Sequence, residues 1–185
     1  LAVLHVSSED QAFALLGSYA SHAASIKTFL VPANDGSTST NGQILEFDSR
    51  TGGYIGVAAA SQGVSQIQGM TRGPDGRLYG SYFDTNTNTD GRVLRIRPDG
   101  AVETFVSAGS GGLYSPLGLT FGADGNLYVG NNLGNVLRYD GATGAFIDVF
   151  ASGLLVPQDV VFGPDGHLYV SNGFGNSISR FDGAT

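Results

Sequence analysis

Few side chains in this sequence are of the types that carry nucleophilic or acid–base chemistry. The 185 residues include 3 His and no Cys, so disulfides, thiol nucleophiles and thiolate metal sites are excluded. His167 directly follows a Pro-Asp-Gly turn, where we expect it to face solvent; the others are His5 and His22. No Ser stands in the Gly-x-Ser-x-Gly turn of a serine hydrolase. The sequence therefore predicts no catalytic residue.

The best candidates for ligand binding are polar residues at positions where copies of an internal repeat differ. Gln68, Gln158 and Asp159 lie at the start of expected innermost strands, and Asn131 and Asn172 lie at the far end of the expected second strands. These side chains form a polar channel mouth that binds a small ligand, or one that is merely hydrated. Both interpretations fit the sequence.

A second candidate is a cation site in a loop rich in oxygen-bearing side chains. The ligands would alternate along the loop: Asp84, Asn86, Asn88 and Asp90. An Arg occupies the twelfth position, where an EF-hand has its bidentate Glu, so an EF-hand is excluded. The alternatives are a low-affinity calcium site and a polar loop without metal. No cofactor other than calcium is expected.

Two loops between expected second and third strands are longer than their later counterparts. They are residues 34–42, with Asp35 and Asn41, and residues 84–91. Equivalent loops of neighbouring repeats should project side by side and form a rim that binds a partner. Because these loops lack aromatic and Arg residues, we expect weak or glycan-like contacts.

An internal repeat organises the chain that carries these residues. One motif occurs three times, spaced by 49 and then 41 residues: Gly73–Tyr79, Gly122–Tyr128 and Gly163–Tyr169. A second motif follows in four copies: Ile44–Asp48, Val93–Ile96, Val136–Asp140 and Ile178–Asp182. A repeat of this length is typical of one propeller blade.

The turn residues predict four antiparallel strands in each repeat. Asp-Gly turns join the first strand to the second, since Asp and Gly tolerate the positive φ of a hairpin. The fold class is therefore all-β, a propeller of four-stranded antiparallel blades. The second and third strands are present four times, but the first and fourth are clear only three times. The chain is thus a closed four-bladed propeller or part of a larger one, and an incomplete propeller would tend to self-associate.

Residues that recur in every blade are expected to be scaffold. The Asp residues of the Asp-Gly motif should form turns, the Tyr residues that end it should pack between blades, and the Arg residues of the second motif should make exposed pairs: Asp75, Asp124, Asp165, Tyr79, Tyr128, Tyr169, Arg95, Arg138 and Arg180. Residues 1–27 depart from the repeat, so we divide the chain into this segment and blades over residues 28–185. The segment is a strand with a short helix, or strands that complete blades.

The repeats resemble the NHL-type and gluconolactonase-like β-propeller superfamily, which includes the streptogramin lyases. The resemblance rests on Pro116–Gly141 and Pro157–Gly183, and more loosely on Gln68–Gly100. It implies about six blades, and in the lactonases an Asn after the inner-strand Pro that helps to hold a divalent cation. That Asn is absent here, and no inner strand carries the His and Glu expected of the lyases.

Composition narrows the remaining function classes. The net charge is −7 with a single Lys, Lys27, so no basic surface exists for nucleic acid, and no apolar run is long enough for membrane insertion. The acidic surface, rich in Asn, Thr and Gly, favours an extracellular or cell-surface location. We therefore expect a non-enzymatic binding or structural domain of a secreted or surface protein, with an unidentified protein or glycan as partner. The alternative is a metal-dependent lactonase or lyase.

Overall fold

The computed structural model describes residues 28–33, 42–61, 66–83 and 90–183. These residues form four antiparallel sheets, each hydrogen-bonded in chain order, and each is one predicted blade. Blade one is β1 (Thr28–Ala33), β2 (Gly42–Asp48) and β3 (Tyr54–Ser61); blade two is β4 (Ile67–Arg72), β5 (Leu78–Phe83), β6 (Gly91–Ile96) and β7 (Val102–Val106); blade three is β8 (Pro116–Phe121), β9 (Leu127–Asn131), β10 (Asn135–Tyr139) and β11 (Phe146–Ser152); blade four is β12 (Pro157–Phe162), β13 (Leu168–Asn172) and β14 (Ser177–Phe181).

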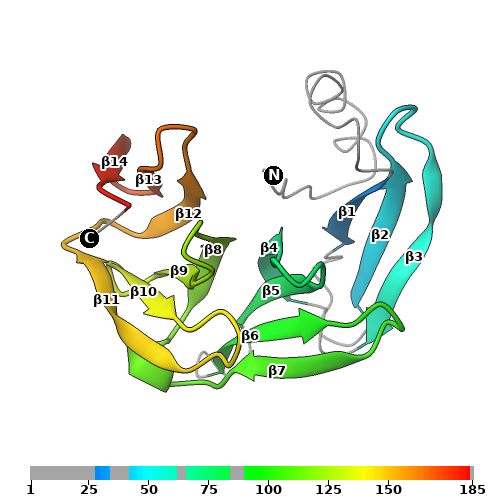
Figure 1. Cartoon of the computed structure of the whole chain (residues 1–185), viewed down its shortest axis with the longest axis horizontal. Coiled ribbons are helices and arrows are strands. Elements are labelled where there is room, and N and C mark those ends of the chain that lie inside the picture. The colour runs from blue at the N-terminus through cyan, green and yellow to red at the C-terminus, as the bar shows by residue number, and fades with distance from the viewer. Residues whose placement is uncertain (1–27, 34–41, 62–65, 84–89, 184–185) are drawn as a thin grey trace.

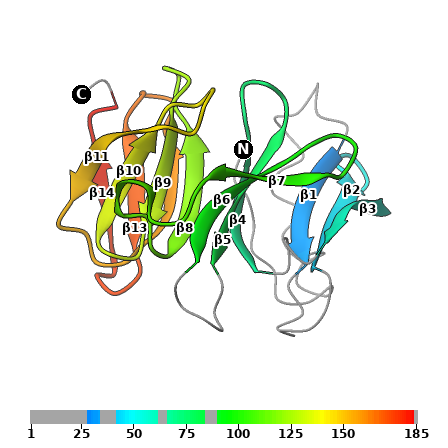
Figure 2. The ribbon, with the colours of Figure 1, turned by 90° about the horizontal axis from the view of Figure 1, so that it is seen from below.

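The blades stand side by side as an arc around a common centre (Figure 1). Strands β4, β8 and β12 lie toward the centre, and β3, β7 and β11 lie on the outside. Figure 2 shows the same blades from below, standing next to one another along the arc. Within the described residues the arc does not close into a ring. No helix in this part of the chain is long or apolar enough to cross a membrane.

The Asp-Gly turns have the predicted geometry in all three copies. Gly76, Gly125 and Gly166 have φ of 79°, 80° and 79°, in the region that side chains rarely adopt. In each turn the preceding Asp accepts a hydrogen bond from the backbone N–H two residues later, at 3.0 Å, 3.0 Å and 3.2 Å. The prediction that these Asp residues form turns is confirmed.

The hydrophobic core lies between neighbouring blades. The ring of Tyr79 packs edge-on against Phe105 of its own blade and Phe121 of the next, both with centroids 4.9 Å away. Tyr128 packs in the same way between Phe150 and Phe162, with both centroids 5.0 Å away. Packing between blades, predicted from the recurrence of Tyr, is therefore confirmed for these two residues.

The inner strands approach one another closely through glycine. A Cβ on Gly118 of β8 would lie 2.5 Å from the Cα of Asp159 on β12. A Cβ on Gly69 of β4 would lie 2.7 Å from the carbonyl oxygen of Leu117 on β8. The hydroxyl of Ser81 bridges the same junction, because it donates to the Leu117 carbonyl. Small residues thus set the spacing of the blades at the centre.

The strands found in each blade are those predicted from the repeat. Blades one and four have three strands each among the described residues: blade one lacks a first strand and blade four a fourth. In this part of the chain β14 pairs with β13 alone. Residues 1–27, where a strand with a helix or blade-completing strands are predicted, lie outside the described residues.

Candidate functional site

The candidate site lies where inner strands begin and second strands end. Hydrogen bonds tie the loops there into one continuous rim. The Asn132 N–H donates to Ser115 O at 3.0 Å, the Leu154 N–H to Gly134 O at 3.0 Å, and the Gly173 N–H to Val156 O at 2.9 Å. Because backbone groups make these bonds, the side chains of the rim are held on a rigid support.

Asn131 holds this support together from inside. It is fully buried, and its Oδ1 accepts from the Tyr114 and Ser115 N–H groups at 3.1 Å and 3.2 Å. Its Nδ2 donates to Gly112 O at 3.1 Å and to the Asn135 side chain at 2.9 Å. A ligand would have to displace these bonds, so the arrangement gives Asn131 a structural role.

Asn172 plays the equivalent part in blade four. It is buried, its Oδ1 accepts from the Leu155 N–H at 3.3 Å, and its Nδ2 donates to Ser179 Oγ at 2.9 Å. Direct ligand contact at the channel mouth thus rests on the three other predicted residues, Gln68, Gln158 and Asp159.

Those three residues lie on inner strands but do not form one cluster of neighbours. Gln158 and Asp159 are exposed at the start of β12, and Gln68 is half-buried on β4. Leu117 of β8 stands at the equivalent position between the two Gln residues. Their ligand-binding role stays a prediction.

Asp159 is the most distinctive of them. It replaces the glycine found at the same position of β4 and β8, and its carboxylate accepts from the Val160 N–H at 2.9 Å. The residue as a whole is exposed, but its carboxylate packs beside Gly118 of β8. The desolvation there raises the pKa of this carboxyl, and the Val160 hydrogen bond opposes the shift. Carboxyls with a perturbed pKa are candidates for hydrogen bonding to a ligand.

The structure adds apolar rim residues that the sequence did not single out. Phe174 is 82% exposed and Leu133 is 62% exposed, each at the tip of a turn between a second and a third strand. Leu155 is also exposed, and its carbonyl accepts from the Phe174 N–H at 3.4 Å. Leu133 lies between Asn132 and Gly134, and Phe174 lies between Gly173 and Gly175, so the available sequence signal was a large apolar residue directly before Gly in a turn.

The backbone beside this patch is strained. Val156, which follows Leu155, has φ of 54°, a conformation that β-branched residues rarely adopt. Its carbonyl accepts from the Gly173 N–H, so the neighbouring blade-four turn holds it there. Strain of this kind persists only where surrounding contacts fix it, and it gathers at functional sites.

The predicted cation loop and long-loop rim fall largely outside the described residues. Asp84, Asn86 and Asn88 are not described, nor are Asp35 and Asn41. Asp90 is described, and its carboxylate forms an ion pair with Arg92. Among the described residues, no group of three His, Asp or Glu side chains is placed to share a metal ion.

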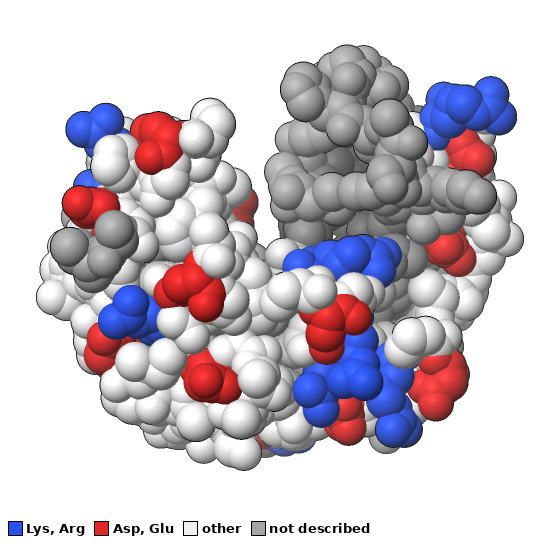
Figure 3. Space-filling view, in the orientation of Figure 1, with Lys and Arg blue, Asp and Glu red and all other residues white. Residues whose placement is uncertain are grey.

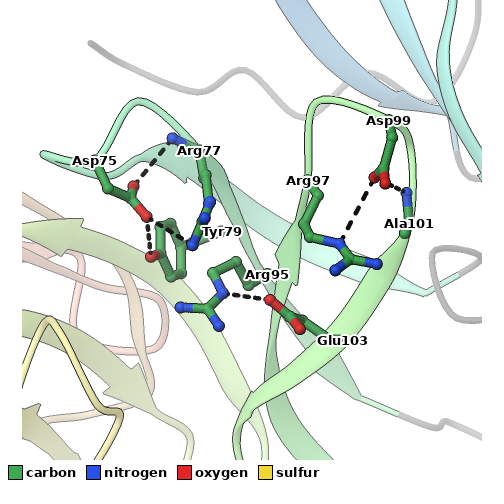
Figure 4. Close-up of polar contacts among 8 residues, drawn as sticks. All are labelled: Asp75, Arg77, Tyr79, Arg95, Arg97, Asp99, Ala101 and Glu103. Carbon is green, nitrogen blue, oxygen red and sulfur yellow. Dashed lines mark hydrogen bonds and ion pairs between the residues drawn. The ribbon is translucent and has the colours of Figure 1, made fainter.

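The recurrent polar residues make a Tyr–Asp contact and an Arg–acid contact in each complete blade, shown for blade two in Figure 4. The Tyr79 hydroxyl donates to Asp75 at 3.0 Å, and Arg95 Nε donates to Glu103 at 2.6 Å. Burial raises the pKa of Tyr79; the Asp75 carboxylate adds to the shift and Arg95 opposes it. The predicted pairing of Arg95 is confirmed, although its side chain is partly buried.

Charge elsewhere is dispersed. Acidic and basic side chains are interspersed over the face drawn in Figure 3, with no large area of one sign. The described ion pairs account for this pattern in part, since Arg77 and Arg97 lie beside Asp75 and Asp99 at 3.6 Å each.

No known family's sequence model matches the chain, and no curated protein is similar enough in sequence to count as a relative. Solved structures give the fold. Virginiamycin B lyase from Staphylococcus aureus superposes with a TM-score of 0.56 at 21% identity over 77% of this chain. The periplasmic gluconolactonase PpgL of Pseudomonas aeruginosa superposes with a TM-score of 0.60 at 20% identity over 84% of it. The chain has a β-propeller fold of the streptogramin lyase and gluconolactonase type.

The matches cover most of this chain but only part of these neighbours. The chain spans 46% of the lyase and 49% of the gluconolactonase. A computationally designed protein, Ika4, is matched over 86% of its own length, with a TM-score of 0.55 at 18% identity. Because propellers of this type support both enzymes and other proteins, the fold alone does not assign an activity.

Proposed function

We propose that this propeller is a non-enzymatic binding domain, and that a protein partner docks on its apolar rim. One observation carries the proposal. Phe174, Leu155 and Leu133 are large, exposed apolar side chains on neighbouring loops that hydrogen bonds hold in place. Adjacent exposed apolar residues on a rigid rim are typical of interaction sites. Gln158 and Asp159 lie on the inner strand just after this loop and supply polar groups that would orient a partner.

The location is a further proposal. The acidic composition, with one Lys among 185 residues, supports an extracellular or cell-surface location. A metal-dependent lactonase or lyase is the competing function, and the likeness to two such enzymes favours it. That activity needs several metal-binding side chains at the channel mouth. Among the described residues predicted to lie there, Asp159 is the one that carries a carboxylate.

Two measurements on the purified protein separate these functions. Peptides are selected from a random library for binding to the wild-type protein, then tested against a Leu133→Ser/Phe174→Ser variant. Val149→Ser serves as control, since Val149 is an exposed aliphatic residue on the outer strand β11. In parallel, lactone hydrolysis is assayed with Ca²⁺, Zn²⁺ and Mg²⁺.

We expect the rim variant to lose binding by at least about tenfold while the control keeps it, because apolar anchors dominate such contacts. We expect no metal-dependent turnover. Peptides that bind both variants equally would remove the rim proposal. Metal-dependent turnover that disappears in Asp159→Ala would establish the enzyme instead.

A further inference from the structure

The apolar rim formed by Phe174, Leu155 and Leu133 continues along the arc to Tyr114. The Tyr114 side chain is 41% exposed, and its N–H donates to Oδ1 of Asn131, two residues before Leu133. Backbone hydrogen bonds join the loops of these residues across the junctions between blades. The four apolar side chains therefore follow one another from the junction of blades two and three to blade four.

These four residues occupy two positions of the repeat, and each position is used twice. Tyr114 and Leu155 lie two residues before the Pro that begins an inner strand. Leu133 and Phe174 lie two residues after the buried Asn that ends a second strand. The corresponding loop of blade two, residues 84–90, contains no apolar residue, so the fold itself does not require apolar side chains there.

The backbone of the rim is already hydrogen-bonded within the chain. Buried Asn side chains accept from the N–H groups of Tyr114, Ser115 and Leu155. At both junctions, carbonyl groups of one loop accept from N–H groups of the next. A strand that adds to a protein needs a row of free N–H and C=O groups, which these described loops do not offer. A partner that binds the rim must therefore gain its affinity from side chains.

Charge gives a second constraint on the partner. The loops and strand ends of the rim, residues 107–118, 130–136, 152–159 and 171–178, contain no Lys or Arg. Asp159 is the charged residue among them, and the chain as a whole has a net charge of −7. Charge complementarity therefore favours a partner with basic side chains.

We propose that the partner presents an amphipathic helix to this rim, with apolar residues on one face and Lys or Arg beside them. The inference rests on the proposed function, because it names the partner of the same surface. A helix satisfies its own backbone hydrogen bonds, so it can bind through side chains alone. Its apolar face would cover the four rim residues, and a basic side chain would pair with the carboxylate of Asp159.

A second copy of the chain fits this surface less well. Two copies that each carry a net charge of −7 repel one another. The described residues contain no α-helix that one copy could present to the other. Charge and secondary structure thus both favour a different polypeptide.

Peptide selection tests the inference on the full chain. Random 16-residue peptides are selected on the wild-type protein and counter-selected on Leu133→Ser/Phe174→Ser, so that the survivors require the rim. Val149→Ser is again the control, because it removes an exposed apolar side chain from the outer strand β11. We expect the survivors to carry apolar residues at i, i+3 or i+4, and i+7, with an excess of Lys and Arg.

The tightest rim-dependent peptide is then measured by fluorescence anisotropy at pH 8. One version carries Pro at its centre, and its control carries Pro at the first residue, which a helix tolerates. Another version carries Glu in place of each Lys and Arg. The peptide is also measured against Asp159→Asn, with Asp99→Asn as the control, since Asp99 is an exposed acid in a turn of blade two.

We expect the central Pro to weaken binding by at least about tenfold, because Pro breaks the interior of a helix. The Glu version should bind at least about fivefold more weakly, and Asp159→Asn should lower the affinity about twofold to fivefold. The first-residue Pro and Asp99→Asn should leave the affinity unchanged.

The outcomes separate the helix from the function on which it rests. If rim-dependent peptides have alternating apolar residues, or bind equally with the central Pro, the helix is wrong and the proposed function stands. Equal binding of the Glu version, or to Asp159→Asn, overturns the basic side of the helix in the same way. If no selected peptide requires the rim, the proposed function fails and the inference fails with it.

Discussion

Asp159 breaks a rule that the other inner strands follow. Gly69 and Gly118 stand at its position in β4 and β8, where the next inner strand leaves no room for a Cβ. Asp159 instead places a carboxylate beside Gly118, its own N–H donating to Ser171 Oγ at 3.0 Å. Burial there disfavours the charged form and raises the pKa of Asp159.

This gives a pH-dependent prediction for Asp159→Asn. A carboxyl whose folded pKa is raised stabilises the fold fully below its unfolded value, near 3.8, and that contribution is lost as pH rises through the folded pKa. We therefore expect the variant to be more stable than wild type at neutral pH, with a difference that shrinks toward pH 3. Urea unfolding at a series of pH values measures it.

Asp140→Asn is a control of opposite sign. Hydrogen bonds from the Thr143 hydroxyl and backbone N–H lower the pKa of Asp140. Its contribution is present above the unfolded pKa and lost as pH falls through the folded pKa. This variant should be less stable than wild type at neutral pH and equal to it in acid. If the stability of both variants relative to wild type changed with pH in the same direction, the raised pKa of Asp159 would be contradicted.

At the scale of elements, the sequence predicts the blades well because turn chemistry is local. The Asp-Gly motif specifies its hairpin through its own carboxylate and glycine, so three copies predict three turns. The sequence does not predict that each Tyr hydroxyl binds the turn Asp, because strand pairing brings them together. It also misses the exposed Phe174, since exposure depends on how neighbouring loops pack. The ligand-binding role of Gln68, Gln158 and Asp159 remains a prediction.

The close approach of inner strands leads to a prediction for Gly118→Ala. The new Cβ would lie 2.5 Å from Asp159 Cα, which is backbone and cannot turn aside. We expect a loss of about 1–3 kcal/mol in the free energy of unfolding, as for overpacked cores. Gly56→Ala is the matched control in β3, since its Cβ would meet nothing within 4 Å. Denaturant unfolding compares them; if the control loses as much, strand propensity and not blade spacing is responsible.

At the scale of the whole molecule, stability should follow position along the arc. Among the described residues the main contacts between blades join neighbours along the arc, so the stability of the array is close to a sum of blade and interface contributions. Blade three has a described neighbour on both sides, and all five residues of its strand β9 are buried. In blade four the described residues cover one side of the sheet, and every residue of β14 is at least partly exposed.

Native-state hydrogen exchange tests this gradient and, with it, whether the ring is closed. Strand β10 is held between β9 and β11, while β14 pairs in the described structure with β13 alone. We expect amides of β14 to exchange faster than those of β10 by on the order of a hundredfold or more, since edge strands open locally without global unfolding. In a closed four-bladed ring, residues 1–27 would cover β14, and β10 and β14 would be protected alike. Equal protection would show that a further strand covers β14, and the expected gradient would show that β14 is an open edge.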